Sequence, residues 1–486
     1  MDVQNLRNSA INGVFWLVIQ SIFTKLIYFF ITIWLARILI PADFGIVAIC
    51  ILVINIFNML VDFGISSAIV QSKEENKILS VGFWLTIIFG ICAVIITWLV
   101  SPLIAYFFNE SSLIAYVRVM SIDVLLTALE VVPIAVLNKK LRFSKKVLPE
   151  IVFVFVFGGT AVSLAYAQHG PWSIIFGTLC AHFVRTCLYW FVTRPSIHLF
   201  LSKQLIANVL KYGYHVVGVS FLLMILLNGD NVIVRKILDN TALGFYALAY
   251  SIANLPATHI THVMGTVTFP LYSELQDDLF MFNHAFQKVL SLITVVSIPS
   301  AIGIIALAPL LISTLYGETW VPMIIPLQIL CLFGMVRSIL SVCGNIFYAL
   351  NKHYILKRIM FAQLVMMIVF IYPLTKFWGL IGTAISINIA QLVAAVCIFL
   401  YISKLLKGNL INCLLPMFRT IIAAIVMGVF IYVVSLIQFP ISNVSKLSSL
   451  VLSGSIIYLI LIWMLNNSVA KECIKLIKSL MMRDLR

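Results

Sequence analysis

Long apolar runs recur along the whole chain and are separated by short polar segments. A transmembrane helix needs about 20 consecutive, mostly apolar residues. Fourteen runs approach or exceed this length, at 11–35, 43–69, 81–107, 113–137, 148–167, 171–193, 207–228, 243–270, 288–314, 322–349, 357–375, 379–402, 415–437 and 447–465. Only 10% of the residues are charged, whereas soluble domains have about 25%. The runs therefore predict an all-α polytopic membrane protein with about fourteen spans and no room for a separate soluble domain.

The length of the first run argues against a cleaved signal peptide, and the positions of the cysteines argue against a metal site. Run 11–35 is longer than the apolar core of a signal peptide and many others follow it, so we expect it to be retained as a span. Most of the nine cysteines lie inside apolar runs, and none forms a C-x-x-C pair. We therefore expect no disulfide framework, no metal and no cofactor.

Lysine and arginine are distributed unevenly between the two sides of the predicted bundle. With the N-terminus in the cytoplasm, the inner segments hold 22 of the 32 Lys and Arg residues and the outer segments hold 5. The positive-inside rule then places both termini in the cytoplasm. Topology accounts for most of the net charge of +15, so we expect no nucleic-acid partner. The cluster at 138–146, "NKKLRFSKK", could also contact anionic lipid headgroups.

Two similar polar interruptions, "WLARILIPADFGIVA" and "VRKILDNTALGFYAL", lie 199 residues apart. At this offset Arg37 falls on Lys236 and Gly45 on Gly244, and Pro41 suits the first position of a helix. Two unrelated hairpins could use the same turn chemistry. A true repeat instead predicts a six-helix half at 1–200 and another at 201–403, with two further helices and a basic tail at 404–486. Parallel repeats of this kind build transporters around a central cavity.

Several stretches resemble the polysaccharide transport family, the Wzx-like flippases of the multidrug, oligosaccharidyl-lipid and polysaccharide exporter superfamily. They include "GVFWLVIQS", "ARILIPADFGIVAI", "VDFGISSAIVQSK", "LGFYALAYSIANLP", "FPLYSELQDD" and "LYGETWVP", and the similarity runs from about Asn8 to Pro322. Arg37, Pro41, Gly45 and Gly244 belong to these motifs.

The resemblance implies a flippase in the bacterial cytoplasmic membrane. Such proteins move a polyprenyl-diphosphate-linked oligosaccharide to the outer leaflet for lipopolysaccharide, capsule or exopolysaccharide assembly. The resemblance also implies two six-helix bundles in a V around a central cavity, in some members with two extra C-terminal helices. The expected partners are the lipid-linked oligosaccharide, membrane lipids and other polysaccharide assembly proteins.

Four cations fall inside predicted spans, where an ionisable group costs about 2.5–3.5 kcal/mol on insertion scales. They are Lys25, Arg118, Arg185 and Arg337. A diphosphate is a natural ligand for them, since arginine binds phosphate oxygens with two hydrogen bonds. We expect Lys25, Arg185 and Arg337 to face one cavity as unpaired cations. Arg118 is close enough to the outer end of its span to snorkel, and pairing with Asp123 is an alternative.

Three acids also fall inside spans: Asp62, Asp123 and Glu130. Each is a candidate for a structural role or for ion coupling. Asp62 belongs to the "DFG" motif and suits a bond to an adjacent helix end. Glu130, close to Pro133, suggests a kinked helix with a polar partner, and proton coupling is its alternative role.

Known enzyme signatures, including phosphate-binding glycine loops and nucleophile elbows, are absent from the sequence. We therefore expect a transporter and not an enzyme. A cation-coupled multidrug exporter of the same superfamily is the alternative, although it would prefer an anionic cavity. A polysaccharide polymerase or ligase is less favoured, because the predicted outer loops are short.

Overall fold

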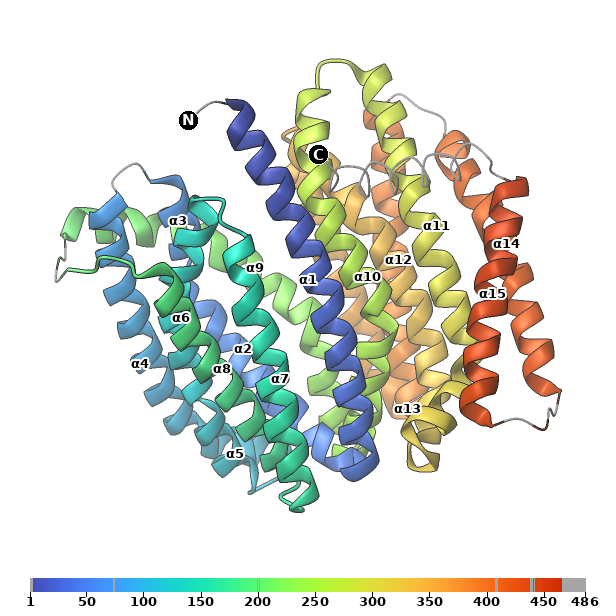
Figure 1. The fold of residues 1–486 in the computed structure, drawn as a ribbon, viewed down its shortest axis with the longest axis horizontal. Coiled ribbons are helices and arrows are strands. Elements are labelled where there is room, and N and C mark those ends of the chain that lie inside the picture. Colours follow the sequence, from blue (N-terminus) through green and yellow to red (C-terminus); the bar gives the residue numbers. More distant parts are fainter. Residues whose placement is uncertain are drawn as a thin grey trace. The chain divides into compact units, whose positions relative to one another are not determined.

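The computed structural model describes residues 3–72, 75–198, 200, 202–406, 410–437, 440 and 442–465. These residues form helices and connecting turns, without a β-strand among them. Figure 1 shows the long helices in chain order. The chain divides into two compact units, unit 1 at Met1–Gly244 and unit 2 at Phe245–Arg486. Each unit is described by itself below.

Unit 1 is built from nine described helices and the first turn of a tenth. They are α1 (Val3–Ile38), α2 (Pro41–Asp62), α3 (Ile65–Gln71), α4 (Glu75–Phe108), α5 (Leu113–Met120), α6 (Ile122–Lys139), α7 (Ser144–Tyr166), α8 (Pro171–Thr193), α9 (Lys203–Ile237) and the start of α10 (Asn240–Glu274). Helix α8 packs against α7 and α6, α7 also packs against α1, and α2 contacts α4, α6 and α9. A buried apolar core joins α3, α4 and α6 around Ile69, Val81 and Val132.

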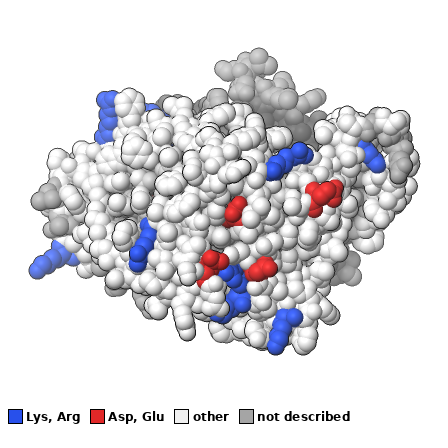
Figure 2. All heavy atoms as spheres, turned by 90° about the horizontal axis from the view of Figure 1, so that it is seen from below, with Lys and Arg blue, Asp and Glu red and all other residues white. Residues whose placement is uncertain are grey.

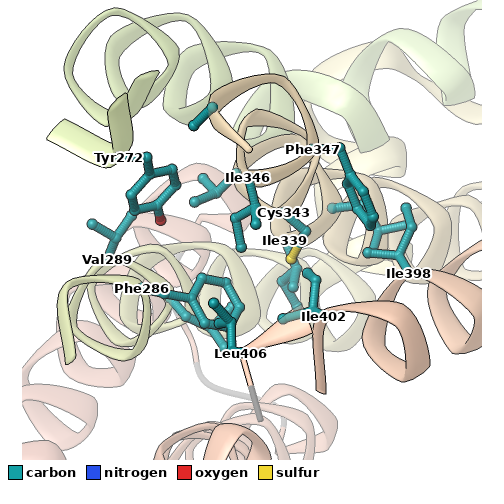
Figure 3. Close-up of a cluster of buried hydrophobic side chains, with 14 of the residues drawn as sticks. Tyr272, Phe286, Val289, Ile339, Cys343, Ile346, Phe347, Ile398, Ile402 and Leu406 are labelled. Carbon is teal, nitrogen blue, oxygen red and sulfur yellow. The ribbon is translucent and has the colours of Figure 1, made fainter. Parts of the chain in front are cut away.

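Unit 2 contains the rest of α10 and the helices that follow it. These are α11 (Leu279–Leu311), a π-helical turn (Ile312–Tyr316), a 3-10 helix (Glu318–Met323), α12 (Ile324–Ala349), α13 (His353–Leu405), α14 (Leu410–Leu436) and α15 (Asn443–Leu465). Figure 3 shows its largest apolar cluster, in which Phe286 of α11, Phe347 of α12 and Ile402 of α13 point toward one another. A second cluster packs α14 and α15 on α11.

The prediction of an all-helical membrane protein is confirmed. Within the described part of the chain, 11 helical segments are long and apolar enough to cross a bilayer. Two predicted spans, 357–375 and 379–402, lie in α13, which is interrupted at Gly379 with φ 57° and ψ −135°, a conformation open to glycine. Predicted span 43–69 is likewise broken between α2 and α3. Pro256, His259 and His262, which make span 243–270 irregular, lie outside the described side chains.

The apolar side chains on the outside of the helices are those expected of lipid contact. Leu99 of α4 is 72% exposed and Phe361 of α13 is 62% exposed. Figure 2 shows a face on which most residues are uncharged and the few Lys, Arg, Asp and Glu residues stand apart or in small groups. Because lipid tails are as apolar as these side chains, helix association depends on close packing and on polar contacts between helices.

Four prolines inside three helices leave carbonyl groups that neighbouring side chains satisfy. Proline cannot donate to the carbonyl four residues earlier, and in lipid that group needs another partner. The Leu129 carbonyl, freed by Pro133, accepts from Trp190 Nε1 at 3.0 Å. The same arrangement recurs for Pro299 with Tyr458 on the Val295 carbonyl (2.8 Å), for Pro309 with Gln328 on Ile305 (3.0 Å), and for Pro102 with Arg118 on Trp98 (3.4 Å). At these four prolines, a side chain from another helix takes the place of the missing backbone donor.

Loops that the charge pattern assigns to one side contact each other within unit 1. Among predicted inner loops, Lys139 Nζ donates to the Ser72 carbonyl at 2.9 Å. Among predicted outer loops, Asn240 Nδ2 donates to Glu110 Oε2 at 2.9 Å, and Arg235 Nη2 lies 3.7 Å from the same oxygen. This pattern agrees with the predicted alternation of inner and outer loops.

The first turns of α2 and α10 cross at their glycines. A methyl group on Gly45 would lie 1.9 Å from the Asn240 carbonyl oxygen, and one on Gly244 would lie 1.8 Å from the Pro41 carbonyl oxygen. Pro41 and Asn240 are themselves 199 residues apart, so the two contacts are equivalent under the repeat offset. The motif glycines therefore permit a backbone approach that no other residue allows.

Gly45→Ala is expected to destabilise unit 1, because the added methyl group meets backbone atoms that must move apart. Overpacking of this kind typically costs about 1–3 kcal/mol. The matched control is Gly159→Ala in α7, where a methyl group meets nothing within 4 Å. Thermal unfolding of the purified protein in detergent measures the difference. A Gly45→Ala midpoint equal to that of Gly159→Ala would show that the crossing does not need glycine.

Candidate functional site: a buried polar cluster and a half-buried arginine

A cluster of polar side chains lies inside unit 1, where α2, α6, α7 and α8 meet. We call it the polar cluster; its members are Asn58, Asp123, Glu130, Glu150, His182, Arg185, Thr186 and Tyr189. Asp123 and Glu130 are seven residues apart on α6, so they share a face two turns apart. His182, Arg185 and Tyr189 share a face of α8 by the same helical spacing. The helical period of two segments therefore assembles the cluster.

Arg185 is the centre of the polar cluster. Its Nη2 lies 2.7 Å from Glu130 Oε2 and its Nε lies 3.1 Å from Glu130 Oε1. Nη1 is 3.5 Å from Glu150 Oε2, and the guanidinium lies over the Phe153 ring at 4.7 Å. The side chain is only 16% exposed. The expectation that Arg185 is an unpaired cation is therefore wrong, because Arg185 pairs with Glu130 of α6 and lies beside Glu150 of α7.

Glu130 has the polar partners that its position near Pro133 suggests. Its Oε1 also accepts from Thr186 Oγ1 at 2.8 Å. Glu150 in turn accepts from Tyr189 Oη at 2.7 Å. Sequence reasoning named neither Glu150 nor Tyr189. The signal available for Glu150 was that it is the single charged residue of the apolar run 148–167.

Asp123 lies at the other end of the polar cluster and is 4% exposed. Its Oδ1 is 3.4 Å from His182 Nδ1, and its Oδ2 is 3.5 Å from Asn58 Nδ2. The predicted alternative pair of Asp123 with Arg118 does not form. Arg118 instead donates from Nε to Ser101 Oγ at 2.9 Å and lies beside the carbonyl freed by Pro102. Its guanidinium therefore provides a donor to the carbonyl that Pro102 leaves free in α4.

The charges of the polar cluster do not balance. Asp123, Glu130 and Glu150 bring three carboxylates against the single guanidinium of Arg185. With His182 neutral and the acids ionised, two negative charges remain in a largely buried place. Buried charge is costly unless it is compensated, so this arrangement attracts a cation or a proton.

Arg337 lies in unit 2, on α12, and is half-buried. Its Nη1 donates to the Tyr250 hydroxyl at 3.2 Å and to Asn254 Oδ1 at 3.1 Å, both on α10. Asn254 is fixed in turn by its own Nδ2, which donates to the Tyr250 carbonyl at 2.9 Å. Among the described side chains, Arg337 has no carboxylate partner, and its Nη2 and Nε are unbonded. A charged fork with open donors is suited to an anionic ligand.

The polar residues that follow Arg337 on α12 bond partly to a neighbouring helix and partly within α12. Asn345 Nδ2 donates to Thr268 Oγ1 of α10 at 2.6 Å, and Ser341 donates to the Ser338 carbonyl at 2.6 Å. The predicted stripe at every fourth residue is therefore an interface between helices over part of its length.

Lys25 and Asp62 occupy different settings in unit 1. Lys25 of α1 is exposed, with no bonding partner among the described residues, whereas the adjacent Thr24 is buried and bonds to the Gln20 carbonyl at 2.8 Å. Asp62 Oδ1 accepts from the backbone N–H of Ser66 at 3.1 Å in the first turn of α3. Asp62 thus caps the helix that restarts after "DFG".

The motif residues at the turn between α1 and α2 stabilise the ends of these two helices. Pro41 is the first residue of α2 and is buried, and Asp43 closes the turn by accepting from the Ile40 N–H at 3.2 Å. Arg37 is exposed in the last turn of α1, a favourable place for a cation. Candidate groups of His, Cys, Asp and Glu that could hold a metal ion are absent from the described residues.

The fold and its apolar helices define a multi-pass membrane protein. The chain has the fold of the lipid II flippase MurJ in its inward closed conformation, with a TM-score of 0.73, 15% identity and 93% of this chain and 98% of that chain covered. A family model described as polysaccharide biosynthesis protein matches residues 34–325, and the chain belongs to this family. It is 27% identical to the lipopolysaccharide biosynthesis protein WzxC of Escherichia coli K12, over 71% of each chain. It is also 25% identical to a membrane protein encoded in the cps region of Klebsiella pneumoniae, over 84% of this chain and 85% of that protein.

Proposed function

We propose that this protein is a flippase that moves a polyprenyl-diphosphate-linked oligosaccharide across the bacterial cytoplasmic membrane. The product would serve the assembly of lipopolysaccharide, capsule or exopolysaccharide. The single observation that carries the proposal is membership of the polysaccharide biosynthesis family in a chain with the fold of a lipid flippase. WzxC, a relative over most of the chain, is a lipopolysaccharide biosynthesis protein by name.

The setting of Arg337 supports an anionic substrate. Nη1 is held by two neutral groups from α10, and the other donors remain open. A diphosphate offers several acceptor oxygens to such a fork, while the lipid tail remains in the bilayer. We propose Arg337 and Lys25 as diphosphate contacts. Arg118 and Arg185 are less suited to this role, because protein groups already occupy their donors.

For the architecture, we propose fourteen spans with both termini in the cytoplasm. The two six-helix halves, 1–200 and 201–403, would form a V around a central cavity, and 404–486 would add two helices and the basic tail. The reciprocal crossing of Gly45 and Gly244 supports a repeat at the 199-residue offset. The proposed partners are the lipid-linked oligosaccharide, membrane lipids and other polysaccharide assembly proteins.

A multidrug exporter is the second candidate, and the polar cluster is the observation that favours it. Three carboxylates against one guanidinium provide the net negative charge that a cationic drug would prefer. Because Glu130 is buried and bonded to Arg185 and Thr186, much of this charge is already engaged by the protein.

Complementation of a deletion strain separates these two functions. The proposal expects loss of surface glycan on deletion, accumulation of lipid-linked precursor, and recovery of both on expression of the protein. Susceptibility to cationic drugs is expected to stay the same. Restored drug resistance without restored glycan would instead support the exporter.

A further inference from the structure

The Nδ1 atom of His182 lies between two groups with opposite requirements. Arg185 Nη2 is 3.1 Å from it and Asp123 Oδ1 is 3.4 Å from it. A guanidinium only donates hydrogen bonds, so the contact with Arg185 requires an unprotonated Nδ1. An ionised carboxylate only accepts, so a bond to Asp123 requires a proton on Nδ1. A single nitrogen cannot meet both requirements at once.

The side of the polar cluster near Asp123 has unsatisfied oxygens. Asp123 Oδ1 and Asn58 Oδ1 are both buried and lack a hydrogen-bond donor among the described residues. A buried carboxylate oxygen without a donor is unfavourable in a low-dielectric environment. One proton between Asp123 Oδ1 and His182 Nδ1 would satisfy this oxygen.

The surrounding charges favour uptake of that proton. From α6, α7 and α8, the ionisable groups of the polar cluster are Glu130, Glu150, Arg185 and Tyr189, and Lys146 of α7 lies close enough to Glu150 to offset part of its charge. Helix α2 contributes the neutral Asn58, and Arg118 of α5 is bonded to Ser101 and to the Trp98 carbonyl. One added proton reduces the net charge of the cluster from minus two to minus one. The Glu150 side chain, 29% exposed and 3.5 Å from Arg185, is the most exposed carboxylate of the cluster.

We propose that Asp123 and His182 share an exchangeable proton and that this proton is the coupling ion for transport. With the proton bound, His182 donates to Asp123 and Arg185 remains held by Glu130. Without it, His182 accepts from Arg185, and two lone pairs face each other across the Asp123 contact. That change alters the bonding between α6 and α8. The proton comes from water and returns to water, so no other reactant is needed. The inference rests on the proposed function.

The test uses inverted membrane vesicles, in which the predicted cytoplasmic face points outward. The probe is a polyprenyl-diphosphate disaccharide that carries a fluorescent group, and a membrane-impermeant reductant added outside bleaches the probe left in the outer leaflet. An interior one pH unit more acidic should enrich the protected probe by up to about tenfold for a one-for-one exchange. His182→Gln and Asp123→Asn should lose this enrichment and reach only the even distribution seen without a gradient. His169→Gln, at an exposed position between α7 and α8, should respond as the natural protein does.

Each outcome separates the two proposals. If the natural protein does not move the probe at all, the proposed function fails and the coupling proposal fails with it. If it equilibrates the probe but ignores the pH gradient, or responds only to a sodium gradient, proton coupling is overturned and the flippase stands. Full enrichment by both variants would overturn the Asp123–His182 site. A variant that brings the probe to an even distribution without a gradient is folded and active. Slower movement by a variant does not change this end point.

Discussion

Arg337→Gln is expected to stop most glycan export while the protein still folds. Glutamine can keep a hydrogen bond to Asn254 or Tyr250, so the change removes the charge and the open donors with little effect on the contact with α10. Losing one partner of a desolvated, hydrogen-bonded charge pair costs about 2–5 kcal/mol, which corresponds to at least about thirtyfold weaker substrate binding. Surface glycan in a deletion strain that expresses the variant measures the effect.

Two further variants define what the Arg337 result means. Arg337→Lys should restore part of the export, because charge is kept and the planar fork is lost. Arg419→Ala removes an exposed arginine of α14 and should leave export normal. Membrane levels, determined by blotting, should match among all variants. Normal glycan from Arg337→Gln at normal protein levels would remove Arg337 from the substrate site, although the flippase proposal could survive.

Arg185→Ala is expected to destabilise unit 1 severely. Removing one partner of a buried ion pair typically costs about 3–5 kcal/mol, because the other charge is left uncompensated. Glu130 is 2% exposed and receives two bonds from this guanidinium, so it would keep only Thr186 as a donor. The amount of folded protein and its unfolding temperature in detergent should both fall steeply.

A double variant distinguishes the cost of leaving the Glu130 charge uncompensated from the cost of losing the packing of the Arg185 side chain. Combining Arg185→Met with Glu130→Gln removes both charges at similar volume, and such replacements are often neutral. The double variant should therefore regain much of the stability that Arg185→Met alone loses. If the double variant is as unstable as the single one, the Arg185–Glu130 pair is not the main contribution of Arg185.

The helical architecture could be predicted because its signal is repeated and local. Long apolar runs show where helices lie, and the first interruption located the start of α2 at Pro41. The breaks within spans were harder to place. The "DFG" break between α2 and α3 and the change from α5 to α6 leave the apolar pattern intact, since both occur inside continuous apolar sequence.

The site could be predicted only in part, because the hydrophobicity pattern does not show which side chains each buried charged residue contacts. The sequence picked out Arg185, Glu130 and Asp123 as costly residues, and all three belong to one cluster. It could not show that Glu150 faces the same arginine, since that depends on how α7 packs against α8. The sequence predicts that Arg118 snorkels or pairs with Asp123, yet the carbonyl freed by Pro102 on another helix becomes one of its partners.

Flipping by the purified protein in lipid vesicles tests the central claim most directly. The fluorescent polyprenyl-diphosphate disaccharide is placed in one leaflet, and its arrival in the other is followed over time. The account predicts that the protein brings the probe to an even distribution far faster than empty vesicles do. It also predicts that Arg337→Gln slows this movement and that the same lipid without its diphosphate is not accelerated. A rate equal to that of empty vesicles, or equal acceleration of the lipid that lacks the diphosphate, would contradict the account.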